Sequence, residues 1–248
     1  MEVIFGKMTI PTDTPLVPRS RLLEVLRDCL NSCNSTIING RAGTGKTMLT
    51  ADFVKRCGWP VAWYTVGAPD ADLSVFLQYL VKSVAYVCPD FGAKTLEAQA
   101  RPGAFLNFPK LAEAFLYDLQ KLDGPLLFVI DDLHLVYDAD WVVPFFHRLL
   151  PLLPTEVHLM ILGRSLPPAP LWRLRSKQRL CVIDESALAF TQAEAETLFA
   201  SYGLTVEQAR AARRKTRGRA AAMHGEAIRL DAAPGIGRRR RGLLYLVA

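Results

Sequence analysis

The stretch that decides the fold is Gly40-Arg41-Ala42-Gly43-Thr44-Gly45-Lys46-Thr47. It fits G-x-x-x-x-G-K-[ST], the pattern of a loop that wraps the phosphates of a nucleotide. Glycines let the backbone turn its N–H groups inward around an anion, and a helix that begins near Lys46 adds the positive end of its dipole. We therefore expect this loop, with Met48 directly after it, to bind a nucleotide. Lys46 is predicted to reach the β- and γ-phosphates, and the Thr47 hydroxyl to ligate Mg²⁺.

The sequence around the loop supplies the strand and the helix that this motif requires. The β-prone residues 35–39 precede it, and residues 47–54 have a helical pattern. Strand and helix patterns alternate as far as residue 185, and only helices follow. This alternation predicts an α/β fold: a P-loop NTPase with a mainly parallel five-stranded sheet flanked by helices, followed by a small helical domain. A helix over residues 141–153 is expected to be interrupted by Pro144. The expected strands cover residues 35–39, 61–66, 125–131, 157–163 and 180–183.

Charged residues follow two of the most apolar strands. The run before Asp131 and Asp132 shows no alternation, as in a strand that is buried on both faces. Side chains at the carboxyl end of such a parallel strand face the ligand crevice. We assign Asp131 to Mg²⁺, directly or through water. Asp132 is placed either to polarise an attacking water as a general base or to bond a neighbouring loop. Arg164, after the next buried strand, is expected to sense the γ-phosphate, so Lys46, Asp132 and Arg164 are the candidate catalytic residues.

Composition narrows the class of protein further. Half of the residues are hydrophobic and 22% are charged, which indicates a globular chain, and no run is long enough for a membrane span or arranged as a signal peptide. The five scattered cysteines complete no metal site and are expected to be free thiols in the cytoplasm. Most of the net charge of +6 lies in the C-terminal third, where residues 213–219 and 238–241 are basic. These residues form either a solvated face or a surface for nucleic acid or another polyanion.

Several stretches, in order along the chain, carry a family resemblance. They are Leu16-Val17-Pro18-Arg19, the phosphate loop, Val61-Ala62-Trp63, Phe128-Val129-Ile130-Asp131-Asp132-Leu133-His134, Leu162-Gly163-Arg164 with the later Leu171-Trp172-Arg173-Leu174-Arg175, Leu188-Ala189-Phe190-Thr191, and Thr216-Arg217-Gly218-Arg219. Together they resemble the nucleotide-binding module of STAND-class signal-transduction ATPases of the LuxR-type, MalT-like transcriptional activators. The resemblance implies that Arg19 and Gly218 approach the nucleotide. Arg217 and Arg219 depart from the acidic and aromatic residues that are usual in the family.

The resemblance also implies an organisation and a function. We expect an extended leading segment over residues 1–20, a P-loop α/β domain over 21–187, a small helical domain over 188–230, and a linker with a basic tail over 231–248. The expected function is an ATP/ADP-binding switch module with slow Mg²⁺-dependent ATP hydrolysis, truncated before the sensor and DNA-binding domains. A protein partner or self-association on ATP binding is expected, whereas sequence-specific DNA binding and a membrane are not. The alternative is an AAA+-like ATPase that turns over ATP to act on a protein or nucleic acid.

Overall fold

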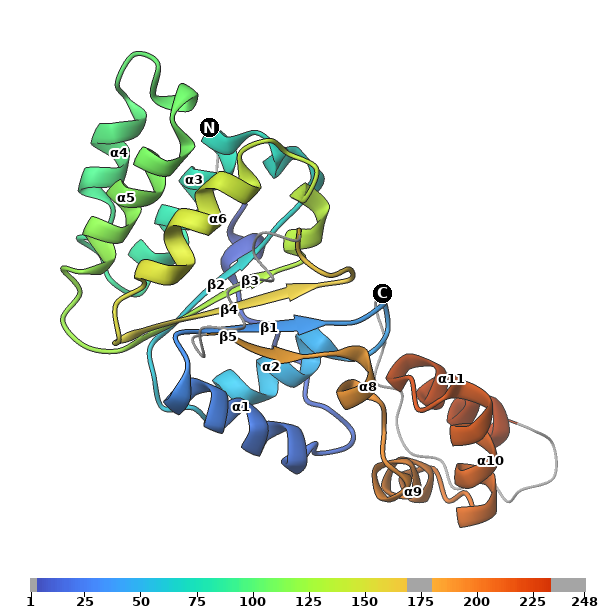
Figure 1. Ribbon diagram of the computed structural model, residues 1–248. Coiled ribbons are helices and arrows are strands. Elements are labelled where there is room, and N and C mark those ends of the chain that lie inside the picture. Colours follow the sequence, from blue (N-terminus) through green and yellow to red (C-terminus); the bar gives the residue numbers. More distant parts are fainter. Residues whose placement is uncertain (1–3, 169–179, 233–248) are drawn as a thin grey trace. The chain divides into compact units, whose positions relative to one another are not determined.

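Five strands lie in one sheet in the order β2-β3-β4-β1-β5, and every neighbouring pair is parallel (Figure 1). The structure is a computed structural model that describes residues 4–168 and 180–232. The α/β fold with a parallel five-stranded sheet that the sequence predicts is therefore confirmed. The strands are β1 (Ser35–Asn39), β2 (Val61–Thr65), β3 (Leu126–Asp131), β4 (Val157–Gly163) and β5 (Leu180–Ile183).

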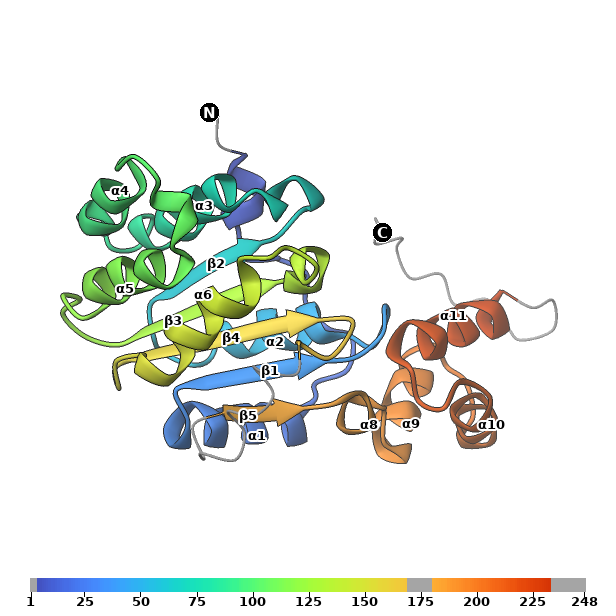
Figure 2. The same ribbon diagram turned by 45° about the horizontal axis from the view of Figure 1, so that its top comes forward.

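Helices cover both faces of this sheet (Figures 1 and 2). Because side chains alternate along a strand, Ile37 joins the hydrophobic core on one face and Ile38 joins the core on the other. The first core is closed by α3, α5 and α6, and the second by α1 and α2. Every residue of β3 and β4 is buried, as their largely apolar sequences predict. The helices of this part are α1 (Ser20–Ser32), α2 (Lys46–Val54), α3 (Leu73–Ala85), α4 (Ala93–Gln99), α5 (Phe108–Leu119), α6 (Val142–Leu149) and α8 (Glu185–Leu188).

The chain divides into two compact units, Met1–Ala189 and Phe190–Ala248. The second unit contains α9 (Gln192–Ser201), α10 (Val206–Thr216) and α11 (Ala220–Asp231). Capping boxes start the first two of these helices, with Thr191 paired to Glu194 and Thr205 paired to Gln208. The assignment of residues 21–187 and 188–230 as domains stays a prediction. The expected linker and basic run beyond residue 232, and the expected motif over 171–175, lie outside the described residues.

Pro144 does not interrupt α6, contrary to the expectation from the sequence. The helix begins after Trp141, so Pro144 lies in its first turn. Backbone N–H groups in the first turn have no acceptor within the helix, and a proline there costs no hydrogen bond. The helix ends at Leu149, and a 3₁₀ turn (Leu150–Leu152) follows.

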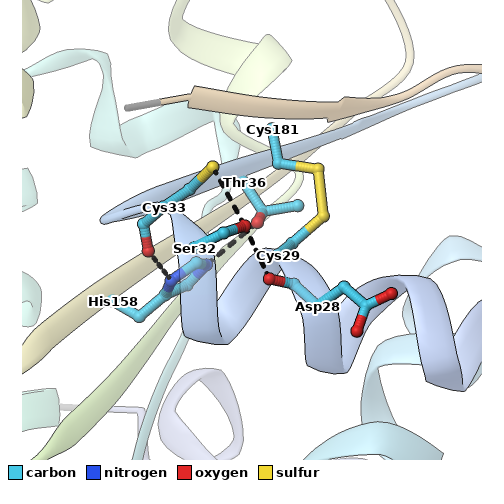
Figure 3. The surroundings of a disulfide bond; sticks show 7 residues. All are labelled: Asp28, Cys29, Ser32, Cys33, Thr36, His158 and Cys181. Carbon is cyan, nitrogen blue, oxygen red and sulfur yellow. Dashed lines mark hydrogen bonds between the residues drawn. A yellow bond between two sulfur atoms is a disulfide. The ribbon is translucent and has the colours of Figure 1, made fainter. Parts of the chain in front are cut away.

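The expectation of five free thiols is also wrong. Cys29 on α1 and Cys181 on β5 form a disulfide, with their Cα atoms 5.8 Å apart (Figure 3). Cys33, Cys57 and Cys88 take part in no disulfide and remain thiols. The pairing could not be found from spacing, because 152 positions separate the two cysteines and the sheet order alone brings β5 to α1.

A buried carboxylate fastens the start of the chain to the loop after β2. Asp70 is fully buried and accepts hydrogen bonds from Lys7 Nζ at 2.6 and 2.7 Å, from Tyr64 Oη at 2.9 Å and from the Gly67 N–H at 2.7 Å. Lys7 belongs to the short 3₁₀ helix η1 (Phe5–Met8), and its ammonium also lies over the ring of Tyr79. No helix within the described ranges combines the length and hydrophobicity needed to cross a bilayer.

Candidate functional site

The phosphate loop lies between β1 and α2, at the carboxyl end of the sheet. Gly45 has a φ of 88° and directly precedes the first residue of α2, a backbone conformation that side-chain-bearing residues rarely adopt. Lys46 is buried, and its Nζ donates to the carbonyl oxygens of Gly40 at 2.6 Å and Arg41 at 3.3 Å. Burial lowers the pKa of Lys46, while the charges of Asp132 and Asp131 oppose this shift. The loop is therefore pre-formed around its own lysine.

The Thr47 hydroxyl meets the carboxylate at the end of β3. Thr47 Oγ1 donates to Asp131 Oδ2 at 2.9 Å, and the Asp132 N–H donates to Asp131 Oδ1 at 2.9 Å. Asp131 is only 3% exposed, and burial raises its pKa to about 6, with the neighbouring Asp132 adding to the rise. The structure thus brings together the two residues that the sequence assigned to Mg²⁺. Their roles as metal ligands stay predictions.

Asp132 and Arg164 are also brought together. Arg164 Nε lies 3.8 Å from Asp132 Oδ1, and His134 Nδ1 lies 3.6 Å from the same oxygen. Asp132 has a left-handed backbone with φ 56° and ψ 29°, which is uncommon outside glycine. Asp132 thus lies near two neighbouring side chains, and its charge also opposes the burial that lowers the pKa of Lys46 in the loop. Its role as a general base or as a bond to a neighbouring loop stays a prediction.

The other residues that the sequence assigns to the nucleotide lie in several different surroundings. Arg19 is buried just before α1 and donates from Nη2 to the Ala189 carbonyl at 3.3 Å. Met48 is half-buried in the first turn of α2. Gly218 belongs to the second unit, where its carbonyl accepts from the Phe190 N–H at 2.8 Å, and its approach to the nucleotide stays a prediction. Arg41, Ala42 and Gly43 are exposed, whereas Gly40 and Thr44 are buried.

Sequence reasoning missed one residue beside the phosphate loop. Glu185, the first residue of α8, accepts from the Arg41 N–H at 2.9 Å and from Arg41 Nε at 2.8 Å. A usable signal existed, because Glu185 closely follows β5 and parallel strands end at the same edge of a sheet. Only the pairing of β5 with β1, which the sequence does not state, shows that this edge lies next to the loop.

Comparison with known proteins places the chain in a family. Residues 15–162 match the model of the AAA ATPase domain, which covers more than half of the 248 residues. The chain belongs to the AAA ATPase domain family. It is a nucleotide-binding P-loop ATPase module, and the resemblance to the STAND-class module of MalT-like regulators is confirmed by the relatives that follow.

The chain is similar in sequence to curated transcriptional regulators and in fold to two solved ATPase structures. The HTH-type transcriptional regulator MalT of Yersinia pestis is 31% identical over 183 residues, which is 74% of this chain and 20% of that protein. The chain thus spans about a fifth of the length of the curated relatives it matches. A STAND protein with a tetratricopeptide repeat sensor from Pyrococcus horikoshii has a TM-score of 0.53 at 17% identity, covering 89% of this chain and 30% of its own. A Walker-type ATPase of Pyrococcus abyssi has a TM-score of 0.52 at 12% identity, covering 90% and 74%. The two solved structures show a shared fold.

Proposed function

We propose that this AAA ATPase domain is an ATP/ADP-binding switch module of a MalT-like transcriptional regulator, with slow Mg²⁺-dependent ATP hydrolysis. The observation that carries the proposal is the hydrogen bond between Thr47 and Asp131, 84 positions apart, beside a pre-formed phosphate loop. Similarity to MalT supports the regulatory context, although it covers a fifth of that protein.

The residues at this edge suit Mg²⁺. A hydroxyl and a carboxylate are hard oxygen ligands, and Mg²⁺ is commonly held by one or two protein oxygens while phosphate oxygens and water complete its shell. The described residues contain no cluster of three or more His, Cys, Asp or Glu side chains that could form a protein-only site. The raised pKa of Asp131, caused mainly by burial, indicates a carboxylate whose charge a cation would compensate. When bound, Mg²⁺ neutralises charge on the phosphates.

The side chains of this site would bind the phosphates and accept the proton released during hydrolysis. Lys46 binds the β- and γ-phosphates, and Arg164, whose side chain is 52% exposed, turns toward the γ-phosphate. Asp132 accepts the proton of the attacking water. In this step the water oxygen bonds to the γ-phosphorus, the bond from that phosphorus to the bridging oxygen breaks, and ADP and inorganic phosphate leave. Arg19, Met48 and Gly218 are proposed as further nucleotide contacts.

The test is nucleotide binding by the purified chain and by Lys46→Ala, with Lys55→Ala as the control. Lys55 directly follows α2 and is exposed, donating to the carbonyls of Thr12 and Asp13 rather than to the loop. Removing a charged hydrogen-bond donor costs about 1.5–3 kcal/mol, so Lys46→Ala should weaken ATP binding by about 10- to 100-fold. Unchanged ATP affinity in Lys46→Ala would falsify the proposal. Retained ADP, slow turnover, and a change of oligomeric state with ATP, measured by light scattering, would support a switch.

A second candidate is an AAA+-like ATPase that turns over ATP while acting on a protein or nucleic acid. One observation favours it: in the described part of the second unit, several basic residues are exposed, among them Arg210, Arg214, Lys215, Arg217 and Arg219. A kcat of about 1 s⁻¹ or more that DNA or a protein stimulates would select this candidate. Retention on DNA should then fall steeply with salt, because basic side chains release counterions on binding.

A further inference from the structure

The carboxylate of Asp132 lies between two very different partners. His134 Nδ1 is 3.6 Å from Asp132 Oδ1, and its side chain is 13% exposed. Arg164 Nε is 3.8 Å from the same oxygen, and its side chain is 52% exposed. Packing therefore fixes the imidazole, whereas the guanidinium has solvent around it and room to move.

The backbone holds the carboxylate and the imidazole in one short turn. The left-handed Asp132 is secured by its N–H, which bonds Asp131 Oδ1 at 2.9 Å, and by its carbonyl, which accepts from the Leu135 N–H at 3.0 Å. His134 lies in the 3₁₀ helix η4 (Leu133–Val136) that starts directly afterwards. A left-handed backbone is unfavourable for a residue other than glycine, and such residues cluster at functional sites.

The end of β4 packs closely against the same segment. A Cβ atom on Gly163 would lie 3.0 Å from the hydroxyl of Tyr137 and 3.7 Å from His134 Cβ. Glycine thus lets β4 approach the segment after β3 closely enough for the next residue, Arg164, to reach Asp132. Asp132 and His134 follow β3, and Arg164 follows the neighbouring strand β4, so the pairing of these two strands brings the three side chains together.

His134 has a ring nitrogen without a hydrogen bond that lies near this carboxylate. Its buried Nδ1 has no hydrogen-bond partner among the residues that the structure describes, and Asp132 is the acid within ion-pair distance. Burial lowers the pKa of His134; the carboxylate of Asp132 opposes the shift, and the positive charges of Arg164 and Lys46 add to it. The ring is therefore neutral near pH 7, and the tautomer with hydrogen on Nδ1 can donate to the carboxylate.

We propose that His134 is a positioning residue, which holds the carboxylate of Asp132 in place after Arg164 has moved to the γ-phosphate of ATP. This inference rests on the proposed function of the site. A phosphate carries more charge than a carboxylate and accepts the planar guanidinium in a two-bond contact, so it competes well for Arg164. His134 has less freedom to follow, because its side chain is only 13% exposed and its Nδ1 is buried. A small approach from the present 3.6 Å lets the neutral Nδ1–H of His134 donate to Asp132, which then stays oriented to accept the water's proton.

The kinetic test compares His134→Phe, which keeps a ring but removes the donor, with His134→Gln, whose amide can still donate. His147→Gln on the exposed side of α6 is the control. We expect His134→Phe to slow single-turnover ATP hydrolysis by about tenfold or more, to leave the Kd values for ATP and ADP within about twofold, and to be partly rescued in His134→Gln. A purely packing role predicts either full activity or a parallel loss of nucleotide binding, and both results overturn the proposal.

A second measurement needs neither nucleotide nor turnover. The pKa of the His134 ring is followed by NMR in the wild type, in Asp132→Asn and in Arg164→Gln, while His147 serves as an internal reference. Removing the carboxylate should lower the His134 pKa, and removing the guanidinium should raise it. An unchanged His134 pKa in Asp132→Asn overturns the proposal even where hydrolysis is too slow to measure. Failure of the wild type to bind ATP, by contrast, counts against the proposed function, and the NMR result still decides whether His134 and Asp132 are coupled.

Discussion

His158 lies inside the sheet with both ring nitrogens occupied. It is 1% exposed in β4, where Nδ1 lies 2.9 Å from the Cys33 carbonyl oxygen and Nε2 lies 2.9 Å from Thr36 Oγ1 (Figure 3). A neutral ring satisfies both contacts, because Nδ1–H donates to the carbonyl and Nε2 accepts from the hydroxyl. Burial lowers the pKa of His158 to about 4, so the folded protein resists protonation that the unfolded chain accepts near its usual value of 6.5.

This difference predicts a loss of stability in mild acid. Above pH 6.5 neither state is protonated at His158, and between pH 6.5 and 4 only the unfolded chain binds the proton. The free energy of unfolding should therefore fall by about 1.4 kcal/mol per pH unit through this range, or about 3 kcal/mol in all, from this residue. Urea unfolding at several pH values measures the slope. His158→Gln should flatten it and the exposed His147→Gln should not; equal slopes in all three proteins would contradict the prediction.

Among the elements, α4 begins in a confined place. Its N-cap, Gly92, has a φ of 101°, and a Cβ atom there would lie 2.2 Å from Cγ1 of the buried Val81 on α3. Gly124, in the turn before β3, has a φ of 102° and open space around it. The two glycines therefore share a backbone conformation and differ in packing.

This pair separates backbone strain from overpacking. Gly124→Ala should cost about 1 kcal/mol, because only the left-handed backbone opposes the added methyl group. Gly92→Ala should cost about 1–3 kcal/mol more, since Val81 must also move. Chemical unfolding of the two variants beside the wild type measures both values. If the two substitutions destabilise the protein equally, α3 and α4 are less tightly packed than their contacts indicate.

The link between α1 and β5 is a second property of the elements. Alkylation of the unreduced protein should modify Cys33, Cys57 and Cys88, and reduction should expose Cys29 and Cys181 as well. Because the bond closes a loop of 152 positions, chain entropy predicts a stabilisation of up to about 5 kcal/mol. Cys181→Ser should therefore lower the free energy of unfolding under oxidising conditions, whereas Cys88→Ser should change it much less. Five reactive thiols before reduction would show that the bond does not form.

At the scale of the whole molecule, both large hydrophobic cores belong to one unit. Among the described residues, neither core extends beyond Leu188. The second unit buries a smaller set of its own, made of Phe190, Leu198, Phe199, Leu204 and Met223 with the alanines Ala195, Ala209, Ala212 and Ala227. Small domains bury a low fraction of their surface and are marginally stable. The two units are therefore expected to differ in their ability to fold alone.

A chain shortened to residues 1–189 tests this expectation. It should unfold cooperatively, with a melting temperature within about 5 °C of the full chain, because it keeps both cores. The separate segment 190–232 should show weak helicity and no sharp transition, since three short helices lose their packing easily. Circular dichroism on heating measures both. A shortened chain that fails to fold would show that the second unit contributes to the core of the first.

Much of this architecture could be predicted from local sequence. The largely apolar runs of β3 and β4 and the capping boxes of α9 and α10 depend on neighbouring residues, so their positions agreed closely with expectation. Proximity of Thr47 and Asp131 followed from the rule that parallel strands end at one edge. The disulfide, the Glu185–Arg41 contact and the position of His134 depend on which strands are neighbours and on how a turn is aimed. The order of strands in a sheet and the direction of a turn cannot be deduced from a short stretch of sequence.

The Lys7–Asp70 contact has a practical consequence for anyone shortening or labelling this protein. The first turn looks dispensable, since Ile4 and Phe5 are exposed, yet Lys7 supplies the positive charge to a fully buried carboxylate. Removing one member of a buried pair costs about 3–5 kcal/mol, a large part of the stability of most domains. Affinity sequences and dyes should therefore not replace residues 4–8, because Lys7 in this segment is the cation that pairs with Asp70.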